Sequence, residues 1–270
     1  MAQLLDRAIA TLNGYLELGN GLTIAPRARF VRNPECSDVH DANHTGTIRA
    51  ATAAEVDALM HAADEFFAAH EHRTFKVDAR TPAPFEARLF LDGYRATPEL
   101  QLLLEGPLNI TPSAIDIRAV TSDVEWQSVL RLTRLDHEEE AQKASHEPHT
   151  PAFTSRMVAT KRAKAPDLQF FLARLEGEDC AFFSSWPGVD GVGKVEDLFT
   201  DPMFRRRGVA TALIVHAVAD ARDRGAGPVL IGADPDDTPK QMYAAMGFRP
   251  LCAFRSYTRE LISDSDEIIS

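Results

Sequence analysis

A short basic segment that contains a glycine is the part of this chain best suited to hold a phosphate. It reads Arg205-Arg206-Arg207-Gly208-Val209-Ala210 and leads into an apolar stretch with the period of a helix. The N-terminus of a helix offers unpaired backbone N–H groups and the positive end of the helix dipole to an anion. Gly208 removes a side chain where backbone and ligand must come close, and the small Ala210 keeps the next turn open. The three arginines add charge suited to a pyrophosphate or a ribose 3′-phosphate.

The elements around this segment alternate between strands and helices. A strand at 195–200 precedes it, and a short buried strand at 229–231 and a helix near Pro239 follow it. Apolar residues spaced by three or four positions predict a buried helix that stops near Gly225; they are Val209, Ala210, Leu213, Ile214, Ala217, Val218 and Ala221. This order predicts a sheet covered by helices.

Upstream, the pattern predicts a strand, a helix and a meander. A strand at 115–120 is followed by Ser122-x-x-Glu125, a capping box that opens a helix with apolar residues as far as Leu135. A polar stretch at 136–150 separates this helix from strands at 168–175 and 180–184. Glycine-containing turns are expected at 176–178 and 187–191.

Arg205-x-x-Gly208-x-Ala210 resembles the R/Q-x-x-G-x-G/A signature of the GCN5-related N-acetyltransferases, and Tyr243, four residues before Gly247-Phe248, extends the resemblance. The similar region covers residues 115–260. The resemblance implies an α/β fold with a mixed central sheet flanked by helices, acetyl-CoA as co-substrate, and acetyl transfer to a primary amine of a small molecule or protein. The alternative is a non-catalytic acetyl-CoA-binding module whose N-terminal half binds a partner. The amine acceptor stays unknown, because a fold does not identify a substrate.

The resemblance also assigns roles by position. The pantetheine arm of the donor is expected beside the strand at 198–200, where a backbone N–H stabilises the oxyanion. Tyr243 matches the tyrosine that donates to the leaving thiolate, with packing under the donor as its other possible role. The expected donor-binding residues are Leu198, Phe199, Thr200, Arg205, Arg206, Arg207, Gly208, Val209, Ala210, Thr211 and Asp237.

Glu196 is the candidate general base, acting directly or through a water. A carboxylate inside a strand is costly to bury without a partner or a function. Side chains alternate along a strand, so Glu196 shares a face with Leu198 and Thr200, whereas Asp197 points the other way. A bulge, which the resemblance implies here, would exchange these faces, so Asp197 stays a rival. A structural ion pair of one of these carboxylates with an arginine is the alternative role.

The first 110 residues predict a smaller α/β domain. Amphipathic helices are expected at 4–16 and after the capping box Thr52-x-x-Glu55. The order strand (74–78), helix (84–92), Gly93-Tyr94 and strand (100–104) repeats the order between 229 and 257. The repeated order of elements is explained either by a degenerate copy of the fold of the C-terminal half or by an unrelated α/β extension. Leu89 stands where such a copy would need the tyrosine. We expect domains at 1–110 and 111–262 and an acidic tail at 263–270.

Composition restricts the class of protein further. The chain has 270 residues, 44% of them hydrophobic, and a net charge of −11, which opposes broad nucleic-acid binding. No apolar run is long enough to span a bilayer.

Cys36, Cys180 and Cys252 are far apart, which favours reduced thiols and a cytoplasmic location. The histidines at 40–44 and 137–149 lack the spacing of zinc sites, so we expect solvated loop residues and no metal. The sequence does not predict the oligomeric state, and a monomer and a homodimer are both compatible with it.

Overall fold

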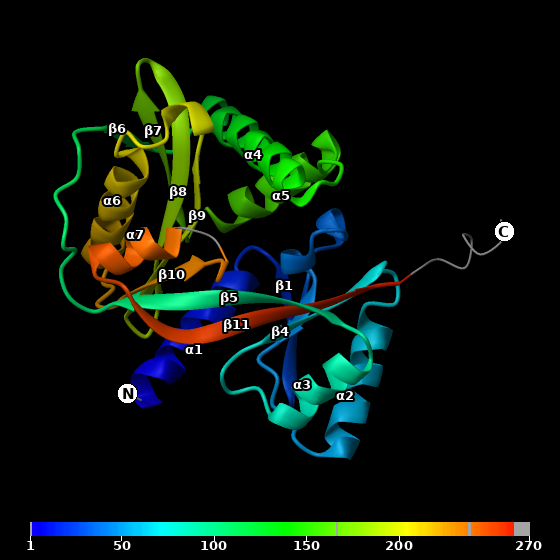
Figure 1. The fold of residues 1–270 in the computed structure, drawn as a ribbon. Helices are drawn as coiled ribbons and strands as arrows, with labels where there is room; N and C mark the ends of the chain where they lie inside the picture. Colours follow the sequence, from blue (N-terminus) through cyan, green and yellow to red (C-terminus); the bar gives the residue numbers. More distant parts are fainter. Residues whose placement is uncertain (1, 166, 237–238, 262–270) are drawn as a thin grey trace. The chain divides into compact units, whose positions relative to one another are not determined.

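The computed structural model describes residues 2–165, 167–236 and 239–261 (Figure 1). The chain forms two compact units, and neither is a continuous stretch. The first unit comprises Met1–Gly19 and Gln101–Leu251, and the second comprises Asn20–Leu100 and Cys252–Ser270. Both combine strands and helices, which confirms the predicted α/β class with a mixed sheet flanked by helices.

The sheet of the first unit has the strand order β10-β9-β8-β7-β6. Strands β6 to β9 form an antiparallel meander, and β10 pairs with β9 in parallel. The strands are β6 (Asp116–Ala119), β7 (Gln169–Leu175), β8 (Glu178–Val189), β9 (Val192–Thr200) and β10 (Val229–Ala233). The end of β5 (Arg95–Leu104) and the start of β11 (Arg249–Glu260) also belong to this unit.

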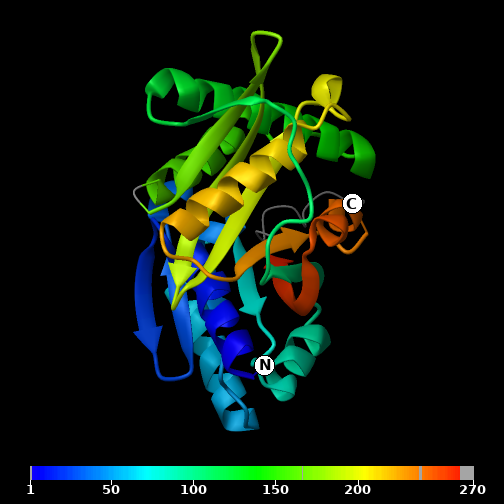
Figure 2. The same ribbon diagram turned by 90° about the vertical axis from the view of Figure 1, so that its left-hand side faces the viewer.

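Helices cover both faces of this sheet. Helix α6 (Val209–Asp223) packs on one face, and α4 (Asp123–Ala144) lies on the opposite side (Figure 2). Alternation along β7 shows the two faces directly, because Phe171 contacts His216 of α6 and Phe170 contacts Trp126 of α4. Helices α5 (Pro151–Lys164) and α7 (Pro239–Met246) also belong to the unit, as does the single turn η3 (Pro202–Phe204).

Helix α1 (Ala2–Glu17) belongs to the first unit, although the sequence-based division at residue 110 grouped it with the N-terminal domain. Its buried face packs against β8 and β9. The hydroxyl of Thr11 donates to the carbonyl of Val192 at 2.8 Å, and the absence of a side chain at Gly14 admits the ring of Trp186. The periodicity predicted the apolar face correctly but carried no information on which strands would cover it.

A β-bulge interrupts β9 at Asp197. Phe182 of β8 faces Phe199, whereas Ser184 faces Glu196, so β9 has one extra residue between these pairs. Asp197 accordingly has a left-handed backbone, with φ of 67°. Pairing between β9 and β10 ends at Val195 and Ile231, so the last five residues of β9 run on without a β10 partner.

The second unit has the strand order β1-β2-β3-β4-β11. Strands β1 (Gly21–Ala25), β2 (Ala28–Arg32), β3 (His44–Gly46) and β4 (His72–Val77) are joined by residues 255–260 of β11, which run antiparallel to β4. Helices α2 (Ala53–Phe66) and α3 (Ala83–Leu91) contribute to its apolar core, and the short turns η1 (Pro34–Cys36) and η2 (His40–Ala42) precede β3.

Two helices end in the same way, one in each unit. After α3, the amide of Tyr94 donates to the carbonyl of Leu89 at 3.0 Å; after α7, the amide of Phe248 donates to that of Tyr243 at 3.0 Å. The intervening Gly93 and Gly247 both have positive φ, which removes the steric cost of closing these turns. The repeat noticed in the sequence therefore corresponds to equivalent local geometry.

Some elements were not predicted. Helix α5 falls in the region that the sequence pattern left between a polar stretch and a strand, and β1 to β3 carry no clear alternation. The expectation of solvated histidines was wrong for His44 and His137, which are buried. Each makes a local hydrogen bond, His44 with the carbonyl of Asp41 and His137 with the hydroxyl of Thr154, which offsets the cost of burial. Within the described residues, no helix has both the length and the apolarity needed to cross a bilayer.

Candidate active site

A cavity of about 830 Å³ lies in the first unit at the N-terminal end of α6. Four parts of the chain line it: the last turns of α4, the end of β9, the segment from η3 into α6, and α7. The lining residues are Asp136, Glu139, Glu140, Lys143, Leu198, Phe199, Thr200, Phe204, Arg205, Arg206, Gly208, Val209, Ala210, Thr211, Pro239, Met242 and Tyr243. Its size and mixed polar and apolar lining are typical of a small-molecule site.

The N-terminus of α6 opens on this cavity. Gly208 caps the helix with φ of 82°, and among the described residues no side chain accepts a hydrogen bond from the first-turn amides. These amides therefore stay available to an anionic ligand. A Cβ at residue 208 would also lie 2.6 Å from the hydroxyl of Ser113, so only glycine fits here without displacement. The left-handed backbone and the lack of room for a side chain both explain why the motif has glycine at position 208.

The three arginines of the motif differ in what they contact. Arg205 donates to the carbonyl of Thr200 and forms a two-pronged ion pair with Glu139, so its role is to tie α4 to the end of β9. Arg207 pairs with Glu176 and does not line the cavity. Arg206 lines the cavity and makes no hydrogen bond or ion pair with another described residue. Of the three arginines, Arg206 is therefore the one that lines the cavity with its charge not engaged by a described residue.

The end of β9 supplies the opposite wall. Leu198, Phe199 and Thr200 line the cavity in the part of β9 that β10 does not pair. Thr200 is only 8% exposed, and no described residue hydrogen-bonds its hydroxyl. A buried hydroxyl without a partner is costly, so a ligand that satisfied it would be favoured. Tyr243 of α7, also buried, faces the same space and packs near Phe248.

The two carboxylates proposed for proton transfer lie elsewhere. Glu196 pairs with Lys194, and Asp197 pairs with Lys161 and accepts a 2.7 Å hydrogen bond from Tyr15. Neither lines the cavity. Burial alone would raise the pKa of Asp197, but the charges of Lys161 and its other neighbours outweigh burial and hold that pKa below its ordinary value. The sequence left open an ion pair of one carboxylate with an arginine; in the structure both carboxylates form ion pairs, and the partners are lysines.

A different carboxylate is present in the cavity. Burial, reinforced by the nearby Glu140, raises the pKa of Asp136 to about 7. Its neighbour Glu139 behaves oppositely, because the hydrogen bonds from Arg205 hold its pKa at about 2. Two carboxylates on one helix face thus differ by several pKa units, a common feature of functional sites.

Most of the predicted donor-binding residues are brought together: Leu198, Phe199, Thr200, Arg205, Arg206, Gly208, Val209, Ala210 and Thr211, with Tyr243, line one cavity. Glu196 and Arg207 are not part of its lining, and Asp237 lies outside the described residues. Asp136, Glu139, Glu140 and Lys143 were not among the predicted site residues, because 136–150 was interpreted as a polar stretch after a helix that ended near Leu135, whereas α4 continues to Ala144. Their spacing of three, four and seven residues, one face of a helix, was the available signal.

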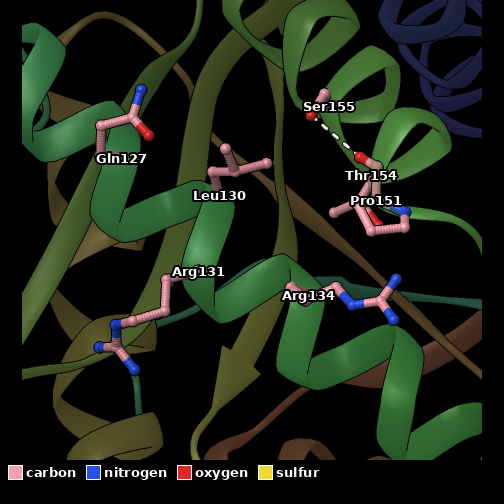
Figure 3. A pocket seen from close by; sticks show the side chains of 7 residues that line it. All are labelled: Gln127, Leu130, Arg131, Arg134, Pro151, Thr154 and Ser155. Atoms are coloured by element: carbon pink, nitrogen blue, oxygen red, sulfur yellow. Dashed lines mark hydrogen bonds between the residues drawn. The ribbon is translucent and has the colours of Figure 1, made fainter.

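A second hollow of about 300 Å³ lies between α4 and α5 (Figure 3). Figure 3 shows Arg131 and Arg134 extending in different directions instead of converging on a common point. Arg134 pairs with Glu138, Arg131 bonds the carbonyl of Asp179, and Thr154 is bonded to His137. Since these polar groups are already satisfied, the larger cavity is the better candidate site.

Comparison with known proteins agrees with this geometry. Residues 126–248 match the model of the acetyltransferase (GNAT) family. No curated protein matches the sequence of the chain. Among solved structures, a GCN5-related N-acetyltransferase from Kribbella flavida has a TM-score of 0.69 at 18% identity, covering 97% of this chain and 96% of that chain. A conserved protein of unknown function from Staphylococcus epidermidis has a TM-score of 0.68 at 13% identity, covering 90% and 95%.

A tandem GNAT protein from the clavulanic acid biosynthesis pathway is similar as well, with a TM-score of 0.55 at 15% identity over 77% of this chain and 70% of that chain. At these identities the similarity shows the fold alone. The family model matches the region 126–248, as the sequence motif indicated, and the similar structures share the fold. The family match supports an acyltransferase role with an acyl-CoA donor.

Proposed function

We propose that this protein transfers an acetyl group from acetyl-CoA to a primary amine of a small molecule or protein. The observation that carries the proposal is the uncapped N-terminus of α6 at Gly208, which opens on a cavity that Arg206 also lines. Free amides and an unpaired arginine at one end of a cavity suit the pyrophosphate of a coenzyme A thioester. The separated cysteines support a cytoplasmic location as part of the proposal.

The remaining walls fit the rest of such a donor. An extended pantetheine arm can pair with the free edge of β9 at residues 198–200, as an added strand does. The thioester then lies between this edge and Tyr243. A backbone N–H of β9 stabilises the oxyanion, and the Tyr243 hydroxyl donates to the departing thiolate. The buried hydroxyl of Thr200 has no partner among the described residues, so a polar group of donor or acceptor that reached it would be favoured.

Calorimetry with acetyl-CoA tests the donor, and a matched pair of variants tests the site. Arg206→Ala removes the cavity arginine and should weaken binding by about tenfold, or about 1.4 kcal/mol. Arg207→Ala removes an arginine that pairs with Glu176 outside the cavity, and should change the affinity little. Equal effects of the two variants would contradict the proposed phosphate position.

Thiol release from acetyl-CoA in the presence of a panel of primary amines tests catalysis. The alternative function is a non-catalytic acetyl-CoA-binding module with a partner-binding N-terminal half. It predicts tight binding without turnover for every amine and for peptides with free lysine or N-terminal amines. The buried Tyr243 beside the proposed thioester position favours the enzyme, since binding alone does not require an acid there.

A further inference from the structure

We propose that Asp136 is the general base of this site, taking a proton from an acceptor amine that arrives as an ammonium ion. This inference rests on the proposed acetyl transfer and adds the residue that activates the nucleophile and the charge state of the substrate. It moves the base from the β9 strand, where the sequence placed it, to the last turns of α4.

The position of Asp136 is the first argument. It lines the cavity together with Leu198, Phe199 and Tyr243, the residues placed around the thioester. Its carboxyl group makes no hydrogen bond or ion pair with another described residue. An unpaired carboxylate that is partly withdrawn from water and lines the same cavity as these residues is suited to accept a proton.

The other carboxylates nearby are less suitable. Glu196 and Asp197 lie outside the cavity and are paired with Lys194 and Lys161. Glu139 is held by Arg205 and Lys143, so its charge is already compensated. Glu140 lines the cavity but is exposed to solvent, where it contributes negative potential without being desolvated.

The charges around Asp136 come from three elements. Glu139, Glu140 and Lys143 are on α4, Lys161 is on α5, and Arg205 precedes α6. The acidic neighbours and burial favour the protonated form of Asp136, whereas Lys161 and Lys143 favour the ionised form. The balance leaves its pKa at about 7, where a base is partly ionised yet still accepts protons readily.

A second observation indicates that a polar ligand belongs here. Thr200 lines the same cavity and is more than nine-tenths buried, and its hydroxyl has no hydrogen-bond partner among the described residues. A primary amine that enters between α4 and β9 can offer this hydroxyl a hydrogen bond while Asp136 takes its proton. The site is therefore arranged for a small cationic nitrogen.

The chemistry balances with the groups that are present. One proton passes from the ammonium to the Asp136 carboxylate, which leaves a neutral amine and a carboxylic acid. The nitrogen lone pair then forms a C–N bond with the thioester carbon, and the C–S bond breaks with its electron pair on sulfur. The second nitrogen proton neutralises the thiolate, with the Tyr243 hydroxyl as hydrogen-bond donor to sulfur. Asp136 returns its proton to solvent after the amide leaves.

The test compares two probe amines in Asp136→Asn. Propylamine and 1,3-diaminopropane are cationic at pH 7 and must lose a proton before attack, whereas methoxyamine is already neutral. Asp136→Asn should lower kcat/KM for the cationic amines by about 100-fold or more, and for methoxyamine by less than about threefold. The wild-type rate with cationic amines should rise with pH through about 7, and the variant should lose this step.

Glu138→Gln is the matched control, because Glu138 lies on the same helix, is exposed, and pairs with Arg134 outside the cavity. It should keep wild-type rates with all amines. A uniform loss with cationic and neutral amines in Asp136→Asn, or full activity of that variant, would overturn the role of Asp136 while leaving acetyl transfer intact. A wild-type chain that binds acetyl-CoA but releases no thiol with any amine would overturn the proposed function and this inference together.

Discussion

The hydroxyl of Tyr15 donates a hydrogen bond of 2.7 Å to the carboxylate of Asp197, which also forms an ion pair with Lys161. One contact thus joins the first helix of the chain to the bulge in β9. The side chains of Asp197 and Lys161 are only 13% and 15% exposed. A pair this buried is costly to break, because removing one charge leaves the other without compensation.

Asp197→Asn should therefore lower the free energy of unfolding by about 3–5 kcal/mol at neutral pH. Because the pKa of Asp197 is lowered by folding, its stabilisation is present above the pKa of the unfolded chain and is lost as the pH falls towards acid. Urea titrations at pH 7 and at acid pH measure the difference. Asp123→Asn, which removes an exposed pair with Arg162 of α5, should cost at most about 1 kcal/mol. A similar small loss for Asp197→Asn would contradict a structural role of the pair.

Asp136→Asn should have the opposite effect on stability. Folding raises the pKa of Asp136 from 3.8 to about 7, so the folded chain binds the extra proton between these values and loses stability as the pH rises through this interval. Above pH 7 the wild type must bury an ionised carboxylate, and the variant should be more stable by up to about 4 kcal/mol. Thermal unfolding at pH 5 and pH 8 checks this: the gain should grow with pH. A variant that is less stable at pH 8 would show that Asp136 has a partner.

Gly208→Glu should weaken acetyl-CoA binding by about tenfold or more, because it places a carboxylate among the amides that face the phosphates. Calorimetry gives the affinity. Gly225→Glu is the control: it adds the same side chain at another left-handed glycine, with φ of 103° and open space, at the far end of α6. Both variants carry the strain of a left-handed position, but only residue 208 lies beside the cavity and against Ser113, so only Gly208→Glu should lose affinity. Unchanged binding in a folded Gly208→Glu protein would remove the donor from this helix end.

Tyr243→Phe should lower turnover by about 10- to 1000-fold while leaving the affinity for acetyl-CoA nearly unchanged. It removes a hydroxyl group near the proposed sulfur position but keeps the ring that packs near Phe248. The measurement is the rate at saturating acetyl-CoA beside the dissociation constant. Tyr94→Phe removes a buried hydroxyl in the second unit and should leave the rate unaltered. Loss of affinity together with rate would assign Tyr243 to donor placement instead of catalysis.

Titration with acetyl-CoA should give one site per chain. Leu89 and Tyr243 occupy equivalent positions in the two similar helix endings, but Leu89 is fully buried in the apolar core of the second unit. No segment like 205–210 precedes it in the sequence. In its described residues, the second unit therefore lacks both a helix start like that at Gly208 and a tyrosine at the position of Leu89. Two equivalent sites per chain would show that the N-terminal half still binds a donor.

The sequence predicted the elements whose signals are local. Capping boxes at Thr52 and Ser122 are formed as expected, and the apolar period after Gly208 matches α6. Signals that depend on distant partners were weaker. Helix α5 buries Thr154, Val158 and Thr160 with no continuous apolar stripe, so periodicity did not show it.

In the site, too, the residues that could be predicted are those with a local sequence signal. The motif at 205–210 and Tyr243 are read from residue types at fixed spacing, and both line the cavity apart from Arg207. The environment of the carboxylates was not predictable. Lys161 and Tyr15 lie 36 and 182 residues from Asp197 in the sequence, and nothing local signals their approach. Asp136 is distinguished by burial and by its unpaired state, which only the three-dimensional structure provides.

The contact between α1 and the strand pair β8 and β9 has a consequence for synthesis on the ribosome. The Thr11 hydroxyl bonds to a carbonyl 181 residues later, so the first helix is complete long before its partner strands are made. Until then its apolar face is exposed to chaperones and other nascent chains. A recombinant fragment that starts near residue 111 would lack this helix and leave Asp197, Trp186 and the adjoining face of the sheet open to water. We expect such a fragment to need residues 1–19, added in trans, in order to remain soluble.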